Sequence, residues 1–307
     1  MDIETRVLAE GLRFPEGPVA MPDGSVLVVE IAAGRLTSIR PDGTTSVVAE
    51  TGGGPNGAAI GPDGACYVCN NGGMAWLERD GRLLPVGAAQ DYRGGSIQKI
   101  DIRSGEVSTL YTECDGRPFS APNDIVFDRA GGFWFTDNGR TAGRQRDVTG
   151  VFYATPDGSS VREVIFPMVS PNGIGLAPDE SCLYVAETVT GRLWAFDLVG
   201  PGELASGKTV TRGERGRLLV GLPGYQLFDS LAVEDCGNVC VATLVNGGIT
   251  IVPPDGGAIE HVAFPDPGTT NICFGGPDMS TAFVTLSTTG RVVARRWPRP
   301  GLRLNCI

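Results

Sequence analysis

One short phrase recurs six times along the 307-residue chain and constrains the fold more than any other feature of the sequence. In most copies, small residues or a proline precede an Asn, Asp or Glu, and a short apolar run and a turn rich in Gly, Pro and Asp follow it. The copies follow one another at intervals of roughly 40 to 67 residues, which is typical of a repeat architecture with one supersecondary unit per copy. The polar residues that lead the six copies are Glu16, Asn56, Asn123, Asn172, Asp229 and Asn271.

Within each copy the apolar residues predict short strands joined by tight turns. The first copy shows the plan, because the run after Glu16 is followed by strand patterns at residues 25–30, 35–39 and 45–49. Glycine-bearing pairs such as Asn138-Gly139 follow the second strands and supply the positive φ that tight hairpins require. The second strands of the later copies are expected at residues 65–69, 132–136, 182–186, 239–243 and 281–286. No segment carries an i, i+3, i+4, i+7 apolar pattern over three turns, so helices are not expected.

Six sheets of four antiparallel strands predict an all-β, six-bladed β-propeller that spans residues 1–307 as a single domain. The last copy supplies three strands, and the N-terminal strand at residues 3–10 is expected to close this last blade as its fourth strand. Such closure removes two open sheet edges, which would otherwise promote aggregation. The extra lengths at residues 80–95, 141–149 and 200–216 are expected to be surface insertions, because the repeat resumes after each. A sandwich or a solenoid is the structural alternative.

Charge and cysteine usage narrow the function classes. The net charge of −10 argues against a nucleic-acid partner, since phosphate binding requires a basic face. No run of about 18 apolar residues is present, so no membrane span is expected, and the acidic start of the chain does not resemble a signal peptide. Cys66 and Cys69 have C-x-x-C spacing, but they lie in a strand pattern without a second pair, so reduced, packed thiols are expected. A cytoplasmic protein is expected, as a monomer or a weak homo-oligomer.

The six lead residues are expected to converge on one ring at the mouth of the channel, because the innermost strand of every blade borders it. Glu16 and Asp229 are carboxylates, and the other four are amides. Hard oxygen donors with two negative charges suit Ca²⁺, or Mg²⁺ or Mn²⁺ with waters completing the shell. Asn and Asp also cap turns, which is the alternative explanation, but a turn does not require Glu16. The ring therefore predicts a metal site or a polar binding site.

Four of the phrases carry a family resemblance that covers nearly the whole chain. They resemble the signature positions of the SMP-30/gluconolactonase/regucalcin family, which is related to the diisopropylfluorophosphatase-like propellers. The phrases are Phe14-Pro15-Glu16-Gly17-Pro18, Ala121-Pro122-Asn123-Asp124, Ser170-Pro171-Asn172-Gly173 and Phe228-Asp229-Ser230. The resemblance implies a six-bladed propeller with one catalytic divalent cation in the channel, Ca²⁺ first, with Mn²⁺, Mg²⁺ or Zn²⁺ as alternatives.

Carried over position by position, the resemblance implies that Glu16, Asn172 and Asp229 are metal ligands. Asn123 would be a fourth ligand, or would hold metal-bound water and substrate. The chain departs from the family pattern at two places. Ser230 stands where the family often has a glycine, and Ala121 stands where some members carry the arginine that grips sugar lactones. The second departure argues against a sugar-acid lactone as the substrate.

The reaction expected on this site is the hydrolysis of a lactone, a cyclic ester. The metal would polarise the carbonyl and stabilise the oxyanion, and Asp229 would act as general base or as nucleophile. Asn56 and Asn271 are expected to orient water or substrate, with Asn123 taking part in catalysis. A Ser-His-Asp triad would need His261, the single histidine, and the chain has no G-x-S-x-G motif, so a catalytic His261 is not expected.

Large or charged side chains of the loops are expected to line the substrate entrance, although ordinary packing between blades is the alternative. These residues are Met74, Trp76, Tyr92, Phe119, Arg140, Tyr225 and Phe228. If they line the pocket, the small-molecule substrate is more apolar or aromatic than gluconolactone.

Three functions remain open at this point. The first is a metal-dependent lactonase. The second is an organophosphate or aryl-ester hydrolase that uses the same site. The third is a non-enzymatic, calcium-binding propeller, because propellers host both roles and the fold alone does not decide between them. A panel of lactones, esters and phosphotriesters separates the three.

Overall fold

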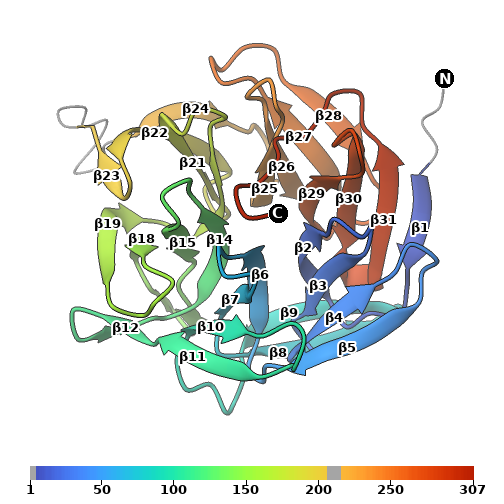
Figure 1. Cartoon of the computed structure of the whole chain (residues 1–307), viewed down its shortest axis with the longest axis horizontal. Helices are drawn as coiled ribbons and strands as arrows, with labels where there is room; N and C mark the ends of the chain where they lie inside the picture. Colours follow the sequence, from blue (N-terminus) through green and yellow to red (C-terminus); the bar gives the residue numbers. More distant parts are fainter. Residues whose placement is uncertain (1–4, 206–215) are drawn as a thin grey trace.

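The computed structural model describes residues 5–205 and 216–307 and confirms the predicted all-β, six-bladed propeller (Figure 1). Six antiparallel sheets surround a central channel, and the innermost strand of each sheet contacts the innermost strands of both neighbouring sheets. The first blade comprises β2 (Pro15–Ala20), β3 (Val26–Glu30), β4 (Arg35–Ile39) and β5 (Thr45–Glu50). The second comprises β6 (Pro55–Ile60), β7 (Cys66–Asn70), β10 (Ser96–Ile100) and β11 (Val107–Tyr111). The third comprises β14 (Pro122–Phe127), β15 (Phe133–Asp137), β18 (Thr149–Ala154) and β19 (Val161–Met168).

The last three blades follow the same order, and the final one borrows a strand from the start of the chain. The fourth blade comprises β20 (Pro171–Leu176), β21 (Cys182–Glu187), β22 (Arg192–Gly200) and β24 (Arg217–Gly221). The fifth comprises β25 (Leu227–Val233), β26 (Val239–Leu244), β27 (Gly248–Val252) and β28 (Glu260–Ala263). The sixth comprises β29 (Thr269–Gly275), β30 (Thr281–Leu286), β31 (Arg291–Arg296) and β1 (Thr5–Ala9). A 3-10 turn, η1 (Ser287–Thr289), lies between β30 and β31.

The predicted closure of the ring is confirmed. Strand β1 pairs antiparallel with β31, and Val7 lies opposite Val293 in the ladder. Residues 3 and 4 of the predicted N-terminal strand lie outside the described residues. Because β1 is the outermost strand of this sheet, the edge of β31 is paired and the two ends of the chain are joined in one blade.

The insertions form small hairpins outside the blades. The one between β7 and β10 is a hairpin of β8 (Met74–Arg79) and β9 (Arg82–Ala88), so it begins before the predicted residue 80. The third blade carries a short hairpin of β16 (Thr141–Ala142) and β17 (Gln145–Arg146). Strands β12 (Glu113–Cys114) and β13 (Arg117–Pro118) form another short hairpin, and the short strand β23 (Glu203–Leu204) pairs with β22. Residues 206–215 of the third predicted insertion lie outside the described residues.

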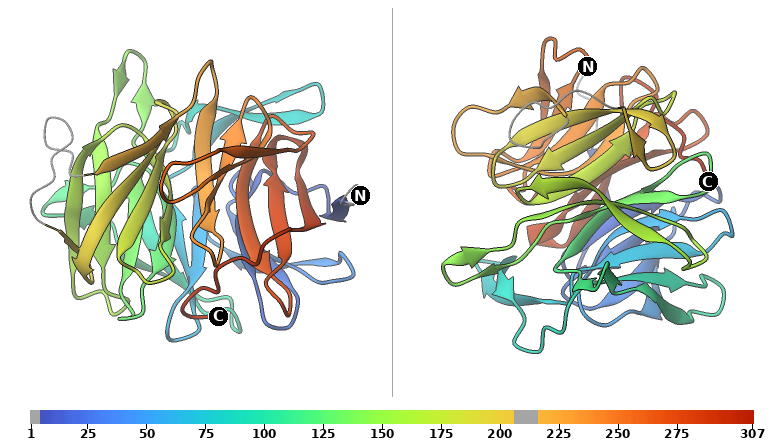
Figure 2. Two further views of the ribbon diagram at one scale, coloured as in Figure 1. Left: turned by 90° about the horizontal axis from the view of Figure 1, so that it is seen from above. Right: turned by 90° about the vertical axis from the view of Figure 1, so that its left-hand side faces the viewer.

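The two larger hairpins and the C-terminal segment lie on opposite faces of the ring. Figure 2 shows β8–β9 and β16–β17 projecting from one face, while the chain's last residues run across the other. The hairpins also contact each other through β9 and β16. We call the hairpin side the mouth of the channel.

The core lies where neighbouring sheets pack face to face. In the third blade Phe135 and Phe152 stack with ring centroids 5.1 Å apart, and Phe119 packs edge-on against both. Trp134 and Trp194 are buried between blades, as their alternating strand patterns predict. Apolar contact between blades therefore holds the ring together.

Six of the eight cysteines are buried as predicted, whereas Cys236 is exposed and Cys306 is partly buried. All eight are free, and Cys66 and Cys69 are both buried on β7. Burial raises the pKa of Cys66 to about 12, so the thiol stays protonated. Among the described residues no helix is long and apolar enough to span a membrane.

Candidate functional site

Each innermost strand carries a β-bulge at or beside its lead residue. In β2 the register shifts between Glu16 and Val19, and in β25 it shifts between Phe228 and Leu231, on either side of Asp229. The same shift recurs in the other four innermost strands, β6, β14, β20 and β29. A bulge adds an unpaired residue and re-aims its side chain, so the bulges explain how one repeated phrase orients six polar residues alike.

Buried polar side chains at the ends of the second strands fix the loops that lead into the innermost strands. Asp137 accepts hydrogen bonds from the backbone N–H groups of Ser120 and Ala121, each at 2.7 Å. Glu187 accepts one from Val169 at 2.8 Å, in the same position of the fourth blade. Glu30 and Asn70 make the matching bonds to Arg13 and Gly54. This second repeated position, which the sequence reading missed, holds the entry to the lead residues in place.

The lead residues meet across neighbouring blades in two hydrogen-bonded pairs. Asn271 donates from Nδ2 to Glu16 Oε2 at 2.6 Å, joining the sixth blade to the first. Asn172 donates from Nδ2 to Asp229 Oδ1 at 2.6 Å, joining the fourth blade to the fifth. All lead residues except Asp229 are buried, and Asp229 is partly exposed.

Asn56 and Asn123 have free side chains. Within the described residues neither side chain forms a hydrogen bond, and Asn123 Oδ1 is buried without a partner. A buried carbonyl oxygen without a partner costs about 1–3 kcal/mol, so this oxygen is available to a ligand or to water. The second and third blades therefore present unused donors and acceptors to the channel.

A third carboxylate, which the sequence reading missed, joins the site. Asp124 follows Asn123 directly, is buried, and accepts a hydrogen bond from the Ile125 N–H at 3.0 Å. Burial, together with repulsion from Glu16, raises the pKa of Asp124 to about 7. A comparison of the position after the lead residue could have found it, because Asp124 is the only acid there among Gly17, Gly57, Asp124, Gly173, Ser230 and Ile272.

Burial raises the pKa values of all three carboxylates, and repulsion from Glu16 adds to the rise at Asp124 and Asp229. Burial raises the pKa of Glu16, opposed by hydrogen bonds from Thr270, Asn271 and the Gly17 N–H. Burial first, and then repulsion from Glu16, raises the pKa of Asp229 well above its usual range. Close, buried like charges are unfavourable without a compensating cation. The site is therefore electrostatically suited to bind one.

The donor chemistry also fits a divalent cation. Carboxylate oxygens of Glu16 and Asp229 and carbonyl oxygens of Asn123 and Asn172 are hard donors of the kind that Ca²⁺, Mg²⁺ and Mn²⁺ take. Over the described residues no three His, Cys, Asp or Glu side chains group closely enough to hold a metal ion, so amide oxygens would have to complete the set. Asn123 Oδ1 has no hydrogen-bond partner among the described residues, so it is the amide oxygen most available to coordinate a cation.

One pH prediction follows from the raised pKa of Asp124. In metal-free protein, Asp124→Asn is expected to gain stability over the wild type as the pH rises from about 4 to about 7, and to keep a constant advantage above that. The folded pKa lies above the unfolded value, so wild-type protein loses this stability as the carboxylate ionises. The measurement is thermal unfolding of both proteins with a chelator across this pH range. A difference that does not change with pH would contradict the assignment.

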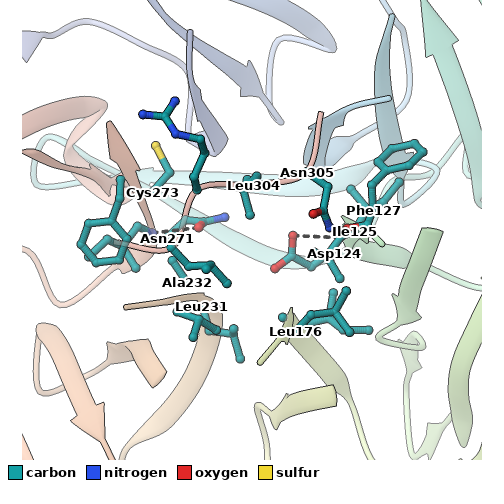
Figure 3. A pocket seen from close by; sticks show the side chains of 18 of the residues that line it. Asp124, Ile125, Phe127, Leu176, Leu231, Ala232, Asn271, Cys273, Leu304 and Asn305 are labelled. Carbon is teal, nitrogen blue, oxygen red and sulfur yellow. Dashed lines mark hydrogen bonds between the residues drawn. The ribbon is translucent and has the colours of Figure 1, made fainter. Parts of the chain in front are cut away.

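The C-terminal segment closes the channel on the face away from the mouth (Figure 3). It encloses a cavity of about 100 Å³ that is lined by Asp124 and Asn271 together with apolar side chains such as Leu231. Asn305 donates from Nδ2 to the backbone oxygen of Phe127 at 2.9 Å, which fixes Leu304 across the opening. The C-terminal segment therefore covers this end of the channel, opposite the mouth.

The predicted entrance residues separate into two groups. Met74, Tyr92 and Arg140 line a cavity of about 490 Å³ at the mouth. The remaining four lie in other surroundings: Trp76 packs on Phe14, Phe119 and Phe228 are buried in the core, and Tyr225 is 80% exposed. His261 lies on β28, the outermost strand of its blade, and pairs with Thr250 and Asn246, away from the lead residues.

Comparisons with known proteins support the family resemblance. A gluconolactonase of Zymomonas mobilis is 28% identical over 305 residues, with 90% of this chain and 77% of that protein covered. A lactonase drp35 of Staphylococcus saprophyticus is 29% identical over 260 residues, with 83% of this chain and 71% of that protein covered.

Solved structures share the fold. A gluconolactonase from Xanthomonas campestris superposes with a TM-score of 0.75 at 22% identity, covering 97% of this chain and 90% of that one. Regucalcin from Agrobacterium tumefaciens, a calcium-binding protein, gives a TM-score of 0.74 at 19% identity, covering 98% of each chain. The family pattern described as the SMP-30/Gluconolactonase/LRE-like region matches residues 14–288. This match over most of the chain confirms the resemblance, and the chain belongs to the SMP-30/gluconolactonase/LRE-like family.

Proposed function

We propose that the chain is a lactonase that depends on a divalent cation, Ca²⁺ first, with Mn²⁺, Mg²⁺ or Zn²⁺ as alternatives. The observation that carries the proposal is the set of oxygens at one end of the channel: the carboxylates of buried Glu16 and partly exposed Asp229, together with the buried, unpartnered Oδ1 of Asn123. The gluconolactonase and lactonase relatives support lactone hydrolysis as the reaction.

The residues that would hold the cation are Glu16, Asn172 and Asp229, with Asn123 as a fourth ligand or as the partner of water and substrate. A bound divalent cation would supply Lewis-acid polarisation of the lactone carbonyl. Asn271 keeps Glu16 in place through the 2.6 Å hydrogen bond to Oε2, and Asn172 does the same for Asp229 Oδ1. These amides therefore fix the carboxylates before substrate arrives, which lowers the reorganisation needed during the reaction.

Asp229 is the residue that we propose to act on the reacting atoms. It is the lead side chain that is partly exposed, so among the lead carboxylates it is the one open to a reacting group. As general base it takes a proton from water, the water oxygen attacks the carbonyl carbon, and the ring C–O bond breaks as the leaving ring oxygen takes up that proton to give a hydroxy acid. As nucleophile its oxygen attacks the carbonyl carbon instead, the ring C–O bond breaks with the ring oxygen taking a proton from water, and a further water cleaves the resulting anhydride and restores the carboxylate.

Metal removal is the direct test of the proposal. Metal-stripped protein is expected to hydrolyse lactones at least about 100-fold more slowly than protein with Ca²⁺, Mn²⁺, Mg²⁺ or Zn²⁺ added back, because a metal typically supplies several kcal/mol of transition-state stabilisation. The measurement is a pH-indicator assay over sugar and aromatic lactones, with aryl esters and phosphotriesters as comparison substrates.

Cation binding is followed separately by the shift in thermal unfolding temperature on adding the metal alone. Full activity in the presence of a strong chelator would overturn the metal dependence. Cation binding without turnover of any lactone would favour the non-enzymatic, calcium-binding alternative, and turnover of only the comparison substrates would favour the ester or phosphotriester hydrolase.

A further inference from the structure

The mouth cavity has a charge that contrasts with the rest of the chain. It lies between the β8–β9 and β16–β17 hairpins, and its volume is about 490 Å³. Its lining contains Arg140 and Arg146 and no carboxylate, although the chain as a whole carries a net charge of −10. Two guanidinium groups in a partly enclosed space attract an anion and repel a cation.

Arg140 is held in place but keeps hydrogen-bonding capacity free. Its guanidinium lies 4.4 Å from the centroid of the Tyr92 ring, and the Tyr92 hydroxyl is itself fixed by donating to the Ser120 carbonyl at 2.5 Å. The Arg140 guanidinium forms a long ion pair with Asp147, whose Oδ2 lies 3.9 Å from Nε, beyond hydrogen-bond distance, and that carboxylate already accepts hydrogen bonds from the Arg140 backbone N–H and the Ser120 hydroxyl. Within the described residues the guanidinium of Arg140 forms no hydrogen bond, and its Nε is buried without a partner.

Two further donors beside the same cavity lack partners. Arg146 donates to Asn138 Oδ1 at 3.0 Å and to Thr141 Oγ1 at 2.7 Å, but its Nε is buried and unpaired. Burial lowers the pKa of Arg146, because its charge is poorly solvated. Asn71 Nδ2 is also buried without a hydrogen bond. Three unpartnered donors beside one cavity are a cost that a bound anion would remove.

The cavity lies next to Asn56 and Asn123, the two lead residues whose side chains form no hydrogen bond within the described residues. Its lining residue Asn71 donates its backbone N–H to the carbonyl of Gly54, two positions before Asn56, at 2.8 Å. Asn138, another lining residue, donates its N–H to the Ala121 carbonyl, two positions before Asn123, at 2.9 Å. A group bound in the cavity would therefore lie beside the two lead amides whose side chains form no hydrogen bond with residues 5–205 or 216–307.

We propose that this cavity is a subsite for an anionic substituent, and that the substrate class is a lactone that carries a carboxylate on its ring. Arg140 presents two terminal nitrogens, which match the two oxygens of a carboxylate, with Tyr92 holding the plane of the guanidinium. Arg146 and Asn71 supply supporting positive charge and a further donor. The inference rests on the proposed lactonase function and deepens it by naming the group that selects the substrate.

The test compares two lactones that differ only in charge, γ-butyrolactone-γ-carboxylate and its carboxamide. Wild-type protein with its metal is expected to have at least about 10-fold higher kcat/KM for the carboxylate. Arg140→Gln is expected to lower the carboxylate-to-carboxamide ratio of kcat/KM by about 10- to 100-fold, mostly through KM, the range expected for a hydrogen bond between charged groups. Arg140→Lys, which keeps the charge without the paired donors, is expected to fall between the two.

The matched control is Arg144→Gln. Arg144 lies in the same hairpin, is exposed and forms no interaction within the described residues, so its loss should leave the ratio unchanged. Equal kcat/KM for both lactones in wild-type protein, or a ratio that Arg140→Gln and Arg144→Gln change alike, would overturn the subsite while leaving the lactonase function intact.

A binding measurement covers the case in which the reaction itself is wrong. Calorimetric titration of γ-butyrolactone-γ-carboxylate into Asp229→Asn protein is expected to show binding that is at least about 10-fold weaker when Arg140→Gln is added. If wild type hydrolyses neither of these lactones nor any sugar or aromatic lactone, but this Arg140-dependent binding is present, the proposed function fails and the anionic subsite stands. Binding that is absent, or indifferent to Arg140, would overturn the subsite.

Discussion

Asp229→Asn is expected to lower kcat/KM for the best lactone by about 10²- to 10⁴-fold, the contribution of a positioned acid or base, and by more if Asp229 is the nucleophile. Asparagine keeps the size of the side chain but neither attacks a carbonyl nor takes a proton at neutral pH. It also places the new side-chain amide of residue 229 beside the amide of Asn172, because Asn172 Nδ2 donates to Oδ1 of residue 229 at 2.6 Å. The measurements are steady-state kinetics with saturating metal and circular dichroism of the variant.

Asp80→Asn is the matched control for this substitution. Asp80 lies at the exposed tip of the β8–β9 hairpin with a φ of 52°, a left-handed conformation that asparagine tolerates. The same chemical change there should leave kcat/KM within about twofold, because the one ion pair that Asp80 forms, with Arg79 at 3.5 Å, is exposed and contributes little. Retained activity in Asp229→Asn would remove Asp229 from the mechanism, whichever of its two roles is assumed.

The fold and the lead residues could be predicted because both are repeated. Six copies of one phrase fix the strand order and the position of each lead residue, so an uncertainty in one copy is corrected by the other five. Closure by β1 followed from the missing fourth strand of the last copy. Hairpin boundaries were less predictable, and β8 begins at Met74, because turns within an insertion have no counterpart in other copies.

Features that occur once could not be predicted in the same way. The pKa of Asp124 depends on its burial near Glu16, which lies 108 positions away in the sequence and on a different blade. Phe119 and Phe228 were expected at the entrance, yet their burial follows from packing between blades, which periodicity within one strand does not determine. The positive mouth cavity combines residues of two insertions, and its charge emerges only when the hairpins meet.

Gly173→Ala is expected to destabilise the protein by about 3 kcal/mol, the upper part of the range for overpacking, and to lower activity by roughly 100-fold. A Cβ at Gly173 would lie 2.7 Å from the Asp229 carbonyl oxygen and 2.8 Å from the backbone nitrogen of Leu231. Neither atom belongs to a flexible side chain, so strands β20 and β25 must move apart. That displacement would break the contact between Asn172 and Asp229 and shift Asp229 within the site.

The origin of this effect is the approach of the two strands and not the backbone conformation of the glycine. Gly221, on the outer strand β24, also lacks a positive φ, and a Cβ there would lie 3.9 Å from the nearest atom, the Cγ of Arg192. Gly221→Ala should therefore be neutral or slightly stabilising, since alanine restricts the unfolded chain more than glycine does. Urea unfolding and lactone kinetics of both variants make the comparison. Equal stability and activity in the two would show that the fourth and fifth blades can separate at the site without consequence, so close contact between them would not be what positions Asp229.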